Sequence, residues 1–262
     1  MKFYKYCGAG NDFIILDNRD GKLTGLSDWA KRLCDRHFSV GADGLIVVEA
    51  PEQGGDCKMR FFNSDGSAAE MCGNGARCLC RFCRDHGISG DIQHIETPAG
   101  PVTGWCEQVN SYRIQLNSPT VWKPQIEAAG VLCDYIELGE NGIPHAVAEA
   151  DLSRDREELR EFARKLRHAT EFPKGANVNL CQIAEGNTVR LLTFERGVED
   201  FTLACGTGAG ATVAALILRE RLEARRAGVL TDGGALTVDY RDGLLFLTGE
   251  AKFVFEGELG DL

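Results

Sequence analysis

Residues 67–83 read SAAEMCGNGARCLCRFC, and the hexapeptide MCGNGA inside this stretch returns in altered form as ACGTGA at residues 204–209. Cys205 follows Cys72 after almost half of the chain's 262 residues. Each copy comes after a strand-like run with a polar turn, and each is followed by residues of helical character. One short match could arise by chance, but the same order of strand, turn, Cys-Gly-x-Gly and helix in both halves predicts a duplicated fold.

Apolar and β-branched runs bounded by turn residues predict many strands. The runs are KFYKY (2–6), FIILD (13–17), LIVVEA (45–50), KMRFFN (58–63), IQHIET (92–97), YRIQLN (112–117), CDYIEL (133–138), NVNLCQI (177–183), VRLLTF (189–194), ALTVDY (235–240) and LLFLTG (244–249). Only four stretches predict helices. They are 26–38 with Ser27 as its cap, the residues from Cys72 to about Arg84, 155–169 capped at Ser153, and the residues from Cys205 through 226.

The strands outnumber the helices and do not alternate with them, which predicts an α+β architecture rather than a doubly wound sheet. Residues 117–130, NSPTVWKPQIEAAG, hold two prolines between strand runs and are the expected connection between domains. We therefore expect an N-terminal half at 1–118 with Cys72 and a C-terminal half at 119–262 with Cys205. About twelve residues at the C-terminus are expected to pack back on the N-terminal half.

The composition excludes several classes of protein. A formal net charge of −10 disfavours a nucleic-acid partner, because such binding needs clustered lysine and arginine. The longest apolar run, ATVAALIL at 211–218, is too short to span a bilayer, and the first residues do not resemble a signal peptide. Eleven cysteines, an odd number without a secretion signal, predict mostly reduced thiols and a cytoplasmic protein.

A Cys-Gly-x-Gly turn at a helix start gives a thiol a reactive environment. The unpaired N–H groups and the positive end of the helix dipole favour the thiolate, and the glycines let a carboxylate approach the same N–H groups. Two such turns allow one cysteine to remove a proton from an α-carbon while the other delivers a proton to the opposite face. This chemistry inverts a stereocentre and requires neither a metal nor another cofactor.

At these residues the sequence resembles the diaminopimelate epimerase family. The resemblance rests on GAGNDF (8–13), NSDGSAAEMCGNGAR (63–77), GANVN (175–179), ERG (195–197) and ACGTGA (204–209), in this order over most of the chain. It implies two related halves, each a mostly antiparallel sheet curled around a central helix, with the site in the cleft between them. It also implies a homodimer, and conversion of L,L-2,6-diaminopimelate to the meso isomer for lysine and peptidoglycan synthesis.

Carried over by position, the resemblance makes Cys72 and Cys205 the two acid-base residues. It implies that backbone and side chains of Gly73, Asn74, Gly206 and Thr207 hold the reacting carboxylate. Further substrate-binding residues would be Asn11, Asn63, Asn177, Arg196 and, at the amino group of the reacting centre, Glu195, with His145 near the cysteines. Two positions depart from the family pattern: Ile143 stands where many members carry Asn, and Gly44 where some carry Gln.

Three other functions stay open. Ile143 is compatible with a racemase of another amino acid on the same scaffold. A zinc-binding interaction module would use Cys78, Cys80, Cys83 and His86, although these lie at several angles around one predicted helix. An isomerase of the phenazine-biosynthesis type would share the fold but lack the paired cysteines.

Overall fold

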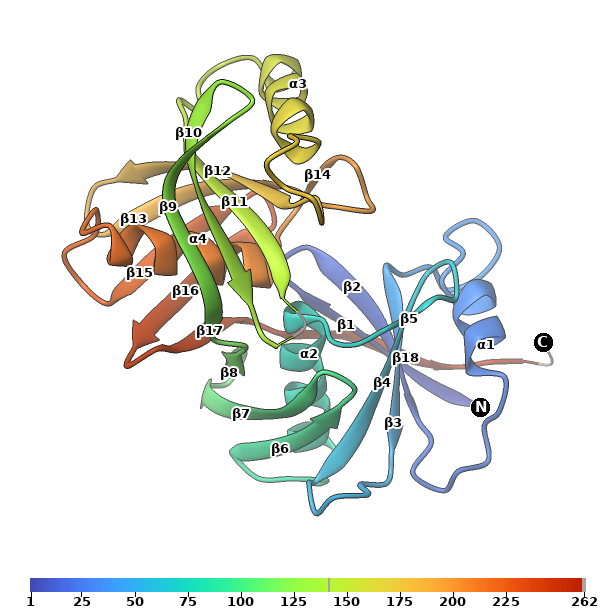
Figure 1. Ribbon diagram of the computed structural model, residues 1–262. Coiled ribbons are helices and arrows are strands. Elements are labelled where there is room, and N and C mark those ends of the chain that lie inside the picture. Colours follow the sequence, from blue (N-terminus) through green and yellow to red (C-terminus); the bar gives the residue numbers. More distant parts are fainter. Residues whose placement is uncertain (141, 261–262) are drawn as a thin grey trace. The chain divides into compact units, whose positions relative to one another are not determined.

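One series of strand pairings occurs twice in the chain. The protein is described by a computed structural model that covers residues 1–140 and 142–260. It divides into two units, one formed by Met1–Ile114 with the segment that begins at Gly249, the other by Gln115–Thr248. Each unit has a mostly antiparallel sheet with one helix enclosed by its strands, as Figure 1 shows for each unit separately. The fold is therefore α+β with duplicated units, as predicted.

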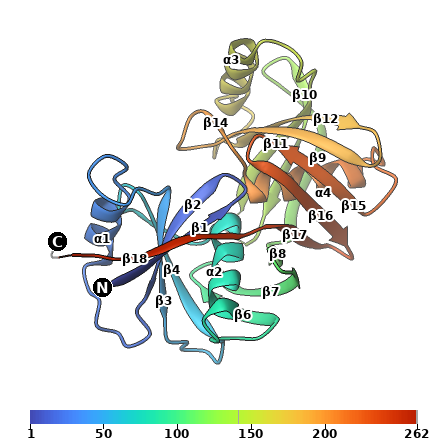
Figure 2. The same ribbon diagram turned by 180° about the vertical axis from the view of Figure 1, so that it is seen from behind.

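The first unit is built from strands at both ends of the chain. In order along the sheet, β18, β1, β2, β3, β4, β6, β7 and β8 are neighbours, with β2–β3 and β4–β6 parallel and the other pairs antiparallel. Figure 2 shows β18 beside β1 from behind. The elements are β1 (Lys2–Gly8), β2 (Asn11–Asp17), α1 (Leu26–Leu33), β3 (Gly44–Glu49), β4 (Cys57–Asn63), β5 (Ala68–Ala69), α2 (Gly73–Asp85), β6 (Ile92–Thr97), β7 (Gly100–Gln108), β8 (Ser111–Leu116) and β18 (Lys252–Glu258).

The second unit repeats this arrangement. Its strands follow the order β9, β10, β11, β12, β13, β15, β16, with β11–β12 and β13–β15 parallel and the others antiparallel. The strand β9 takes the place that β18 has in the first unit. The elements are β9 (Pro119–Ala128), β10 (Val131–Leu138), β11 (Ile143–Glu149), α3 (Arg156–Arg167), β12 (Asn177–Ala184), β13 (Thr188–Phe194), β14 (Phe201–Thr202), α4 (Gly206–Leu218), β15 (Arg226–Thr231), β16 (Gly234–Arg241) and β17 (Leu244–Glu250).

The enclosed helices, α2 and α4, form the centres of the two units. Helix α2 packs against β1, β2, β7 and β18, and α4 packs against β9 to β13 and β16. Ten of the thirteen residues of α4 are buried, because its side chains are small or apolar on every face. Burial on all sides fixes the N-terminus of each helix, where Cys72 and Cys205 stand.

Three helices differ from the predictions at their boundaries, and α1 also ends at Leu33 instead of residue 38. Helix α1 begins at Leu26 after Gly25 in the left-handed conformation, while the Ser27 hydroxyl donates instead to Gly66 O. The cap of α3 is Asp155, whose side chain accepts from two backbone N–H groups. Helix α4 ends at Leu218, because Glu220 adopts a positive φ of 58° that breaks the helix.

Each predicted strand run coincides with a strand, although the runs at 45–50 and 112–117 extend one residue past β3 and β8, and further strands are present. Residues 117–130, predicted as the connection between domains, contain the ten-residue strand β9. The strand tolerates its prolines because Pro119 is its first residue and Pro124 lies at the register shift between β9 and β10. Strands β7, β11, β15 and β18 were also missed. In the described part of the chain, no helix combines the length and apolar character needed to cross a bilayer.

Candidate active site

Cys72 caps the enclosed helix of the first unit. It has an extended backbone, and its carbonyl accepts from Ala76 N at 2.8 Å to close the first helical turn. Gly73 and Asn74 follow inside the helix and are buried, while Cys72 itself is partly exposed. Gly75 leaves little room, since a Cβ atom there would lie 3.2 Å from Ile46 Cδ1. The sequence therefore places the thiol at a helix N-terminus, where the dipole favours an anion.

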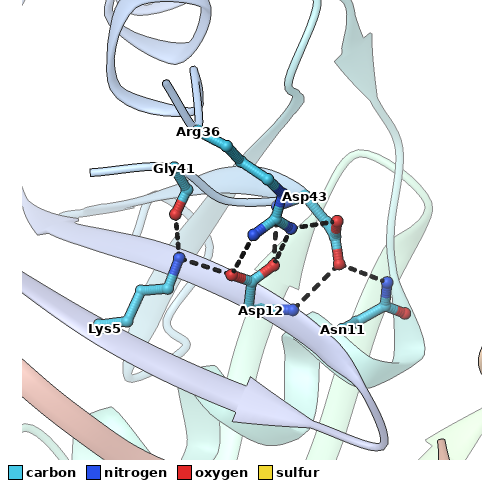
Figure 3. Close-up of polar contacts among 6 residues, drawn as sticks. All are labelled: Lys5, Asn11, Asp12, Arg36, Gly41 and Asp43. Atoms are coloured by element: carbon cyan, nitrogen blue, oxygen red, sulfur yellow. Dashed lines mark hydrogen bonds and ion pairs between the residues drawn. The ribbon is translucent and has the colours of Figure 1, made fainter. Parts of the chain in front are cut away.

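A chain of side-chain hydrogen bonds joins α2 to the start of β2. Arg77 Nη2 donates to Asn74 Oδ1 at 2.8 Å, and Asn74 Nδ2 donates to Asn11 Oδ1 at 2.6 Å. Asn11 Nδ2 in turn donates to Asp43 Oδ2 at 3.0 Å, as Figure 3 shows. Both ends of the Asn11 amide are thus held, so the chain brings together two predicted substrate-binding residues, Asn11 and Asn74.

Asp12 and Asp43 fasten the first residues of β2 to the segment entering β3. Each main-chain N–H donates to the other residue's carboxylate at 3.1 Å, and Arg36 Nη2 bridges both carboxylates at 2.6 and 2.7 Å (Figure 3). The Lys5 ammonium lies 2.7 Å from Asp12 Oδ2 and also donates to Gly41 O. Burial raises the pKa of Asp12, but Arg36 and Lys5 outweigh it and lower that pKa to about 2.

Asn63 lies at the same end of this sheet. It ends β4, where it pairs with Gly44 of β3, and its Nδ2 donates to Ser67 Oγ at 2.9 Å. A Cβ atom at Gly44 would lie 2.5 Å from the Phe61 ring and 2.8 Å from Phe62 O, so a larger residue requires movement there. Glycine at position 44, where some family members carry Gln, therefore fits the space that the Phe61 ring leaves in this chain.

Cys205 has the corresponding position in the second unit. It caps α4 with an extended backbone, and its sulfur accepts from Gly208 N at 3.4 Å and lies 3.4 Å from Thr207 Oγ1. A Cβ atom at Gly208 would lie 2.4 Å from Asn179 Oδ1, so only glycine fits. The turn thus brings Cys205 and Thr207 together, with Gly206 between them in sequence.

A carboxyl group lies beside Cys205. Glu195 hydrogen-bonds with the Cys205 side chain, and its Oε1 accepts from Thr202 Oγ1 at 2.5 Å. Burial raises the pKa of Glu195, and the hydrogen bonds from Thr202 and Cys205 offset that rise only in part. The second unit therefore has an acidic side chain next to its thiol.

Asn177 and Arg196 form a separate pair. Arg196 N donates to Asn177 Oδ1 at 2.9 Å, and Arg196 Nη1 donates to Lys174 O at 2.9 Å. Lys174 pairs with the Glu137 carboxylate at 3.0 Å. Asn177 is almost fully buried while Arg196 is exposed, so an anchored amide positions the main chain that carries an accessible guanidinium.

His145 is fully buried in a polar cluster of the second unit. Its Nδ1 lies 3.2 Å from Asn179 Nδ2, and Thr193 Oγ1 donates to Asn179 Oδ1 at 3.0 Å. Within the described residues, His145 Nε2 has no hydrogen-bond partner. Burial, and then the charge of Arg196, lower the pKa of His145 to about 3, so the ring is neutral near pH 7.

The strand registers show which positions correspond in the two units. Phe13 pairs with Gly44 where His145 pairs with Asn177. Counting back two residues along each strand makes Ile143 the counterpart of Asn11. The first unit thus has its amide at this position, and the second has an aliphatic side chain.

The other cysteines do not assemble a metal site in the described residues, where no group of three or more His, Cys, Asp or Glu is arranged to hold an ion. Cys78, Cys80 and Cys83 are fully buried on α2, and Cys83 Sγ lies 3.5 Å from Cys57 Sγ. His86 Nδ1 lies 2.9 Å from Phe82 O, and its ring stacks on Phe82. These groups are part of the packing of the first unit.

Sequence reasoning missed several residues that hold the site together. Arg77, Asp43, Asn179 and Thr202 each contact a predicted site residue. Arg77 stands five residues after Cys72, but this position does not predict that its charge is buried. Burial depends on the strands around the helix and not on the neighbouring residues alone. The same holds for Thr202, which reaches Glu195 only through the β13–β14 turn.

The duplicated unit places the chain in a known class. Its fold is shared with a phenazine biosynthesis protein of the PhzF family from Bacillus anthracis, with a TM-score of 0.72 and 16% identity over 100% of this chain and 99% of that one. A probable proline racemase from Agrobacterium radiobacter is similar, with a TM-score of 0.69 and 14% identity over 99% and 92%. These likenesses define the class of the chain by its fold alone, as proteins built from two duplicated units.

The family follows from sequence. The diaminopimelate epimerase family model matches residues 3–122 and 139–254, and the chain belongs to this family of isomerases. A diaminopimelate epimerase from Aquifex aeolicus is 39% identical over 100% of this chain and 98% of the relative. One from Archaeoglobus fulgidus is 36% identical over 99% and 96%. The family identified from the motifs is thereby confirmed.

Proposed function

We propose that the protein interconverts L,L- and meso-2,6-diaminopimelate without a cofactor, in lysine and peptidoglycan synthesis. Full-length similarity to relatives named for this activity supports the substrate. The observation that carries the mechanism is the pair of cysteines, each the N-cap of the enclosed helix in equivalent units. Such a pair provides two proton carriers of the same chemical type.

In the proposed reaction, one cysteine as thiolate takes the proton from the α-carbon and becomes a thiol. The other, as thiol, donates its proton to the opposite face and becomes a thiolate. The negative charge that develops at the α-carbon and its carboxylate would be stabilised by the N–H groups at both helix starts, from Gly73, Asn74, Gly206 and Thr207. One proton leaves and one arrives, so turnover exchanges the protonation states of the pair.

The remaining predicted residues would bind the rest of the substrate. Glu195, which hydrogen-bonds with Cys205, would contact the amino group at the reacting carbon. Arg196 suits the distant carboxylate because its planar guanidinium can donate two hydrogen bonds to one anion. Asn11, Asn63 and Asn177 would supply further donors and acceptors, and neutral His145 would support the cysteine end of the site.

The test follows inversion and isotope exchange together. Reduced protein treated with EDTA is incubated with L,L-diaminopimelate in D₂O, and meso product carrying deuterium at the α-carbon is expected. Cys72→Ala and Cys205→Ala should each lower the inversion rate by about 10²–10⁴, the usual contribution of general acid-base groups. Cys106→Ala, a partly exposed cysteine outside the site, is the control. Full inversion by either site variant would contradict the two-base mechanism.

A second substrate is favoured by one observation. Ile143 is the counterpart of Asn11 and offers no polar group, so the binding site for the distant end of the substrate differs from the family pattern. A panel of other amino acids in the same D₂O assay would identify a racemase. If the α-proton exchanges faster in an amino acid that lacks the second amino or carboxylate group, that amino acid would replace diaminopimelate as the proposed substrate.

We also propose a homodimer that forms through β18. Phe253, Val254 and Phe255 on this strand are 42%, 52% and 44% exposed. If two copies pair antiparallel around Phe255, Lys252 lies opposite Glu258, so the strand is complementary to itself in charge. Sedimentation should show a dimer that Val254→Glu disrupts, whereas Val198→Glu, at a similarly exposed valine of the second unit, should not. A monomeric native chain would contradict this proposal.

The proposed location is the cytoplasm, where thiols stay reduced. The reaction requires both cysteines as thiol and thiolate, and no disulfide joins any of the eleven cysteines, which all lie in the described residues. Fractionation of cells that express the chain would test the location.

A further inference from the structure

Arg77 is the largest side chain in the described residues that is completely buried. It lies in the second turn of α2, one turn beyond Cys72. Its Nη2 donates to Asn74 Oδ1 at 2.8 Å, and its Nη1 donates weakly to Gly73 O at 3.4 Å. Nε has no hydrogen-bond partner in the described part of the chain. The guanidinium is therefore directed at the first turn of the helix.

Such a charge is expensive to bury without an anion. Within residues 1–140 and 142–260, no carboxylate forms an ion pair with Arg77, although most other arginines have one. Desolvation strongly disfavours an isolated cation in the interior, and burial lowers the pKa of Arg77. The helix dipole makes this worse, because Arg77 stands near the positive end of α2. Both effects would be relieved by a negative charge at the start of the helix.

Three thiols, Cys78, Cys72 and Cys80, lie near enough to the Arg77 guanidinium to interact with its charge. Cys78 and Cys80 are fully buried, and burial raises the pKa of each thiol far above its usual range, so both stay protonated near pH 7. Cys72 differs from them because it is partly exposed and caps the helix. It is the member of the three that is placed to carry a negative charge.

The second unit has the opposite electrostatic arrangement. Alignment of CGNGAR with CGTGAG makes Gly210 the counterpart of Arg77. A Cβ atom at Gly210 would lie 2.9 Å from Leu116 Cδ1, so the space is filled by an aliphatic side chain. The Glu195 carboxyl group lies beside Cys205. A carboxylate favours the protonated thiol, just as a guanidinium favours the thiolate.

We propose that Arg77 is a positioning residue that makes Cys72 the thiolate and leaves Cys205 the thiol in the resting enzyme. This rests on the proposed function and adds a direction to it: Cys72 begins as the base and Cys205 as the acid. Arg77 also orients the side-chain amide of Asn74, which hydrogen-bonds to Asn11. The charge of Arg77 and the geometry of its hydrogen bonds therefore have separate consequences.

The titratable groups around α2 come from each strand packed against it. They include Cys7 and Tyr6 on β1, Cys106 on β7, Asp12 on β2 and Lys252 on β18, as well as Arg81 and Asp85 on the helix itself. Asp12 is neutralised by Lys5 and Arg36, and Arg81 by Asp85. Arg77 is the buried charge among them that has no carboxylate partner in the described chain.

The test measures thiolate formation directly, without substrate. Native protein is reacted with iodoacetamide across a pH series, and the alkylation of each cysteine is followed by peptide mass spectrometry. The midpoint of the Cys72 curve should lie at least one pH unit below that of Cys205 in the same sample. Equal midpoints, or a lower one for Cys205, would overturn the proposal without any variant.

Two substitutions separate charge from shape. Arg77→Gln keeps an amide donor for Asn74 but removes the charge, and should slow Cys72 alkylation at neutral pH about tenfold, one pKa unit. Arg77→Lys keeps the charge and should keep most of the alkylation rate while kcat/KM falls, because the contact with Asn74 is lost. Cys205 should be unchanged in both.

Arg84→Met, which removes an exposed charge two turns further along α2, is the matched control. Equal slowing by the Gln and Lys variants would assign the effect to packing and overturn the proposal. The alkylation test contains no substrate, so its result does not depend on epimerisation. If the predicted alkylation pattern is found but the chain fails to epimerise diaminopimelate, only the proposed function is contradicted.

Discussion

At the scale of single residues, the site depends on how each polar side chain is anchored. Asn11 is held at both ends of its amide, by Asn74 and Asp43. Arg196 is held through Lys174 O while its guanidinium stays exposed. Anchoring reduces the freedom that each group loses when it binds a substrate, so these side chains are preorganised for recognition.

Arg196→Lys should lower kcat/KM for diaminopimelate by about 10–100-fold, because a lysine cannot reproduce two parallel hydrogen bonds to a carboxylate. Steady-state kinetics in the inversion assay measures the change. Arg190→Lys, on the solvent-facing side of β13, is the control and should leave kcat/KM unaltered. An unchanged value for Arg196→Lys would remove Arg196 from substrate binding.

At the scale of elements, the two enclosed helices owe their positions to the strand ends that surround their N-termini. In the first unit, Asp12 and Asp43 fasten β2 to the entry of β3, and this connection carries the amide chain to α2. In the second unit, Asn179 occupies the space beside Gly208 at the start of α4. Each cysteine is thus presented by a helix whose first turn is fixed from the sheet.

Asp12→Asn should lower the free energy of unfolding at pH 7 and remove part of the acid sensitivity. The pKa of Asp12 is lowered to about 2 in the folded chain, so its contribution is present above the unfolded value near 4 and is lost as the pH falls toward 2. The shift corresponds to about 2 kcal/mol. Urea unfolding at pH 7 and pH 2.5 measures this.

The native protein should lose most of that stability between the two pH values, and the Asp12→Asn variant should not lose the same portion. Asp28→Asn, which changes an exposed carboxylate of the same unit, is the control. Parallel pH curves for the native protein and the Asp12 variant would show that the ion pairs with Arg36 and Lys5 contribute nothing.

At the scale of the whole molecule, the edge strand of each duplicated sheet comes from a different part of the chain. In the second unit the outer partner of β10 is β9, its immediate neighbour in sequence. In the first unit the same place is taken by β18, which pairs with β1 from the opposite end of the chain. The rings of Phe253 and Phe255 contact Tyr6 and Phe3 across this pair. The first unit is therefore complete only when the C-terminal strand is present.

Truncation before Lys252 should destabilise the first unit selectively. It removes several backbone hydrogen bonds to β1, each worth about 0.5–1.5 kcal/mol, and two aromatic contacts. Hydrogen exchange should increase throughout β1 and β2 while β10 to β13 stay protected. A truncation that ends at Leu259 is the control. Equal protection in both truncated chains would show that β18 is dispensable.

The sequence alone was sufficient for the features that depend on local spacing. It predicted the duplication, the two Cys-Gly-x-Gly helix starts, eleven strand segments and the family, because alternation, turn residues and short motifs act within a few neighbouring positions. It misplaced the caps of α1 and α3 and the ends of α1 and α4, where neighbouring candidates compete and tertiary contacts select one of them.

Only the tertiary structure decided which charges are buried and which distant residues meet. No local pattern distinguishes Arg77, with its guanidinium enclosed, from the exposed Arg84 on the same helix. Nor does any pattern pair β18 with β1 across almost the whole chain, or place Thr202 on Glu195. Burial and long-range pairing are properties of the folded sheet around each helix. The sequence therefore determined that two thiols stand at equivalent helix starts, and the fold decided that their electrostatic surroundings differ.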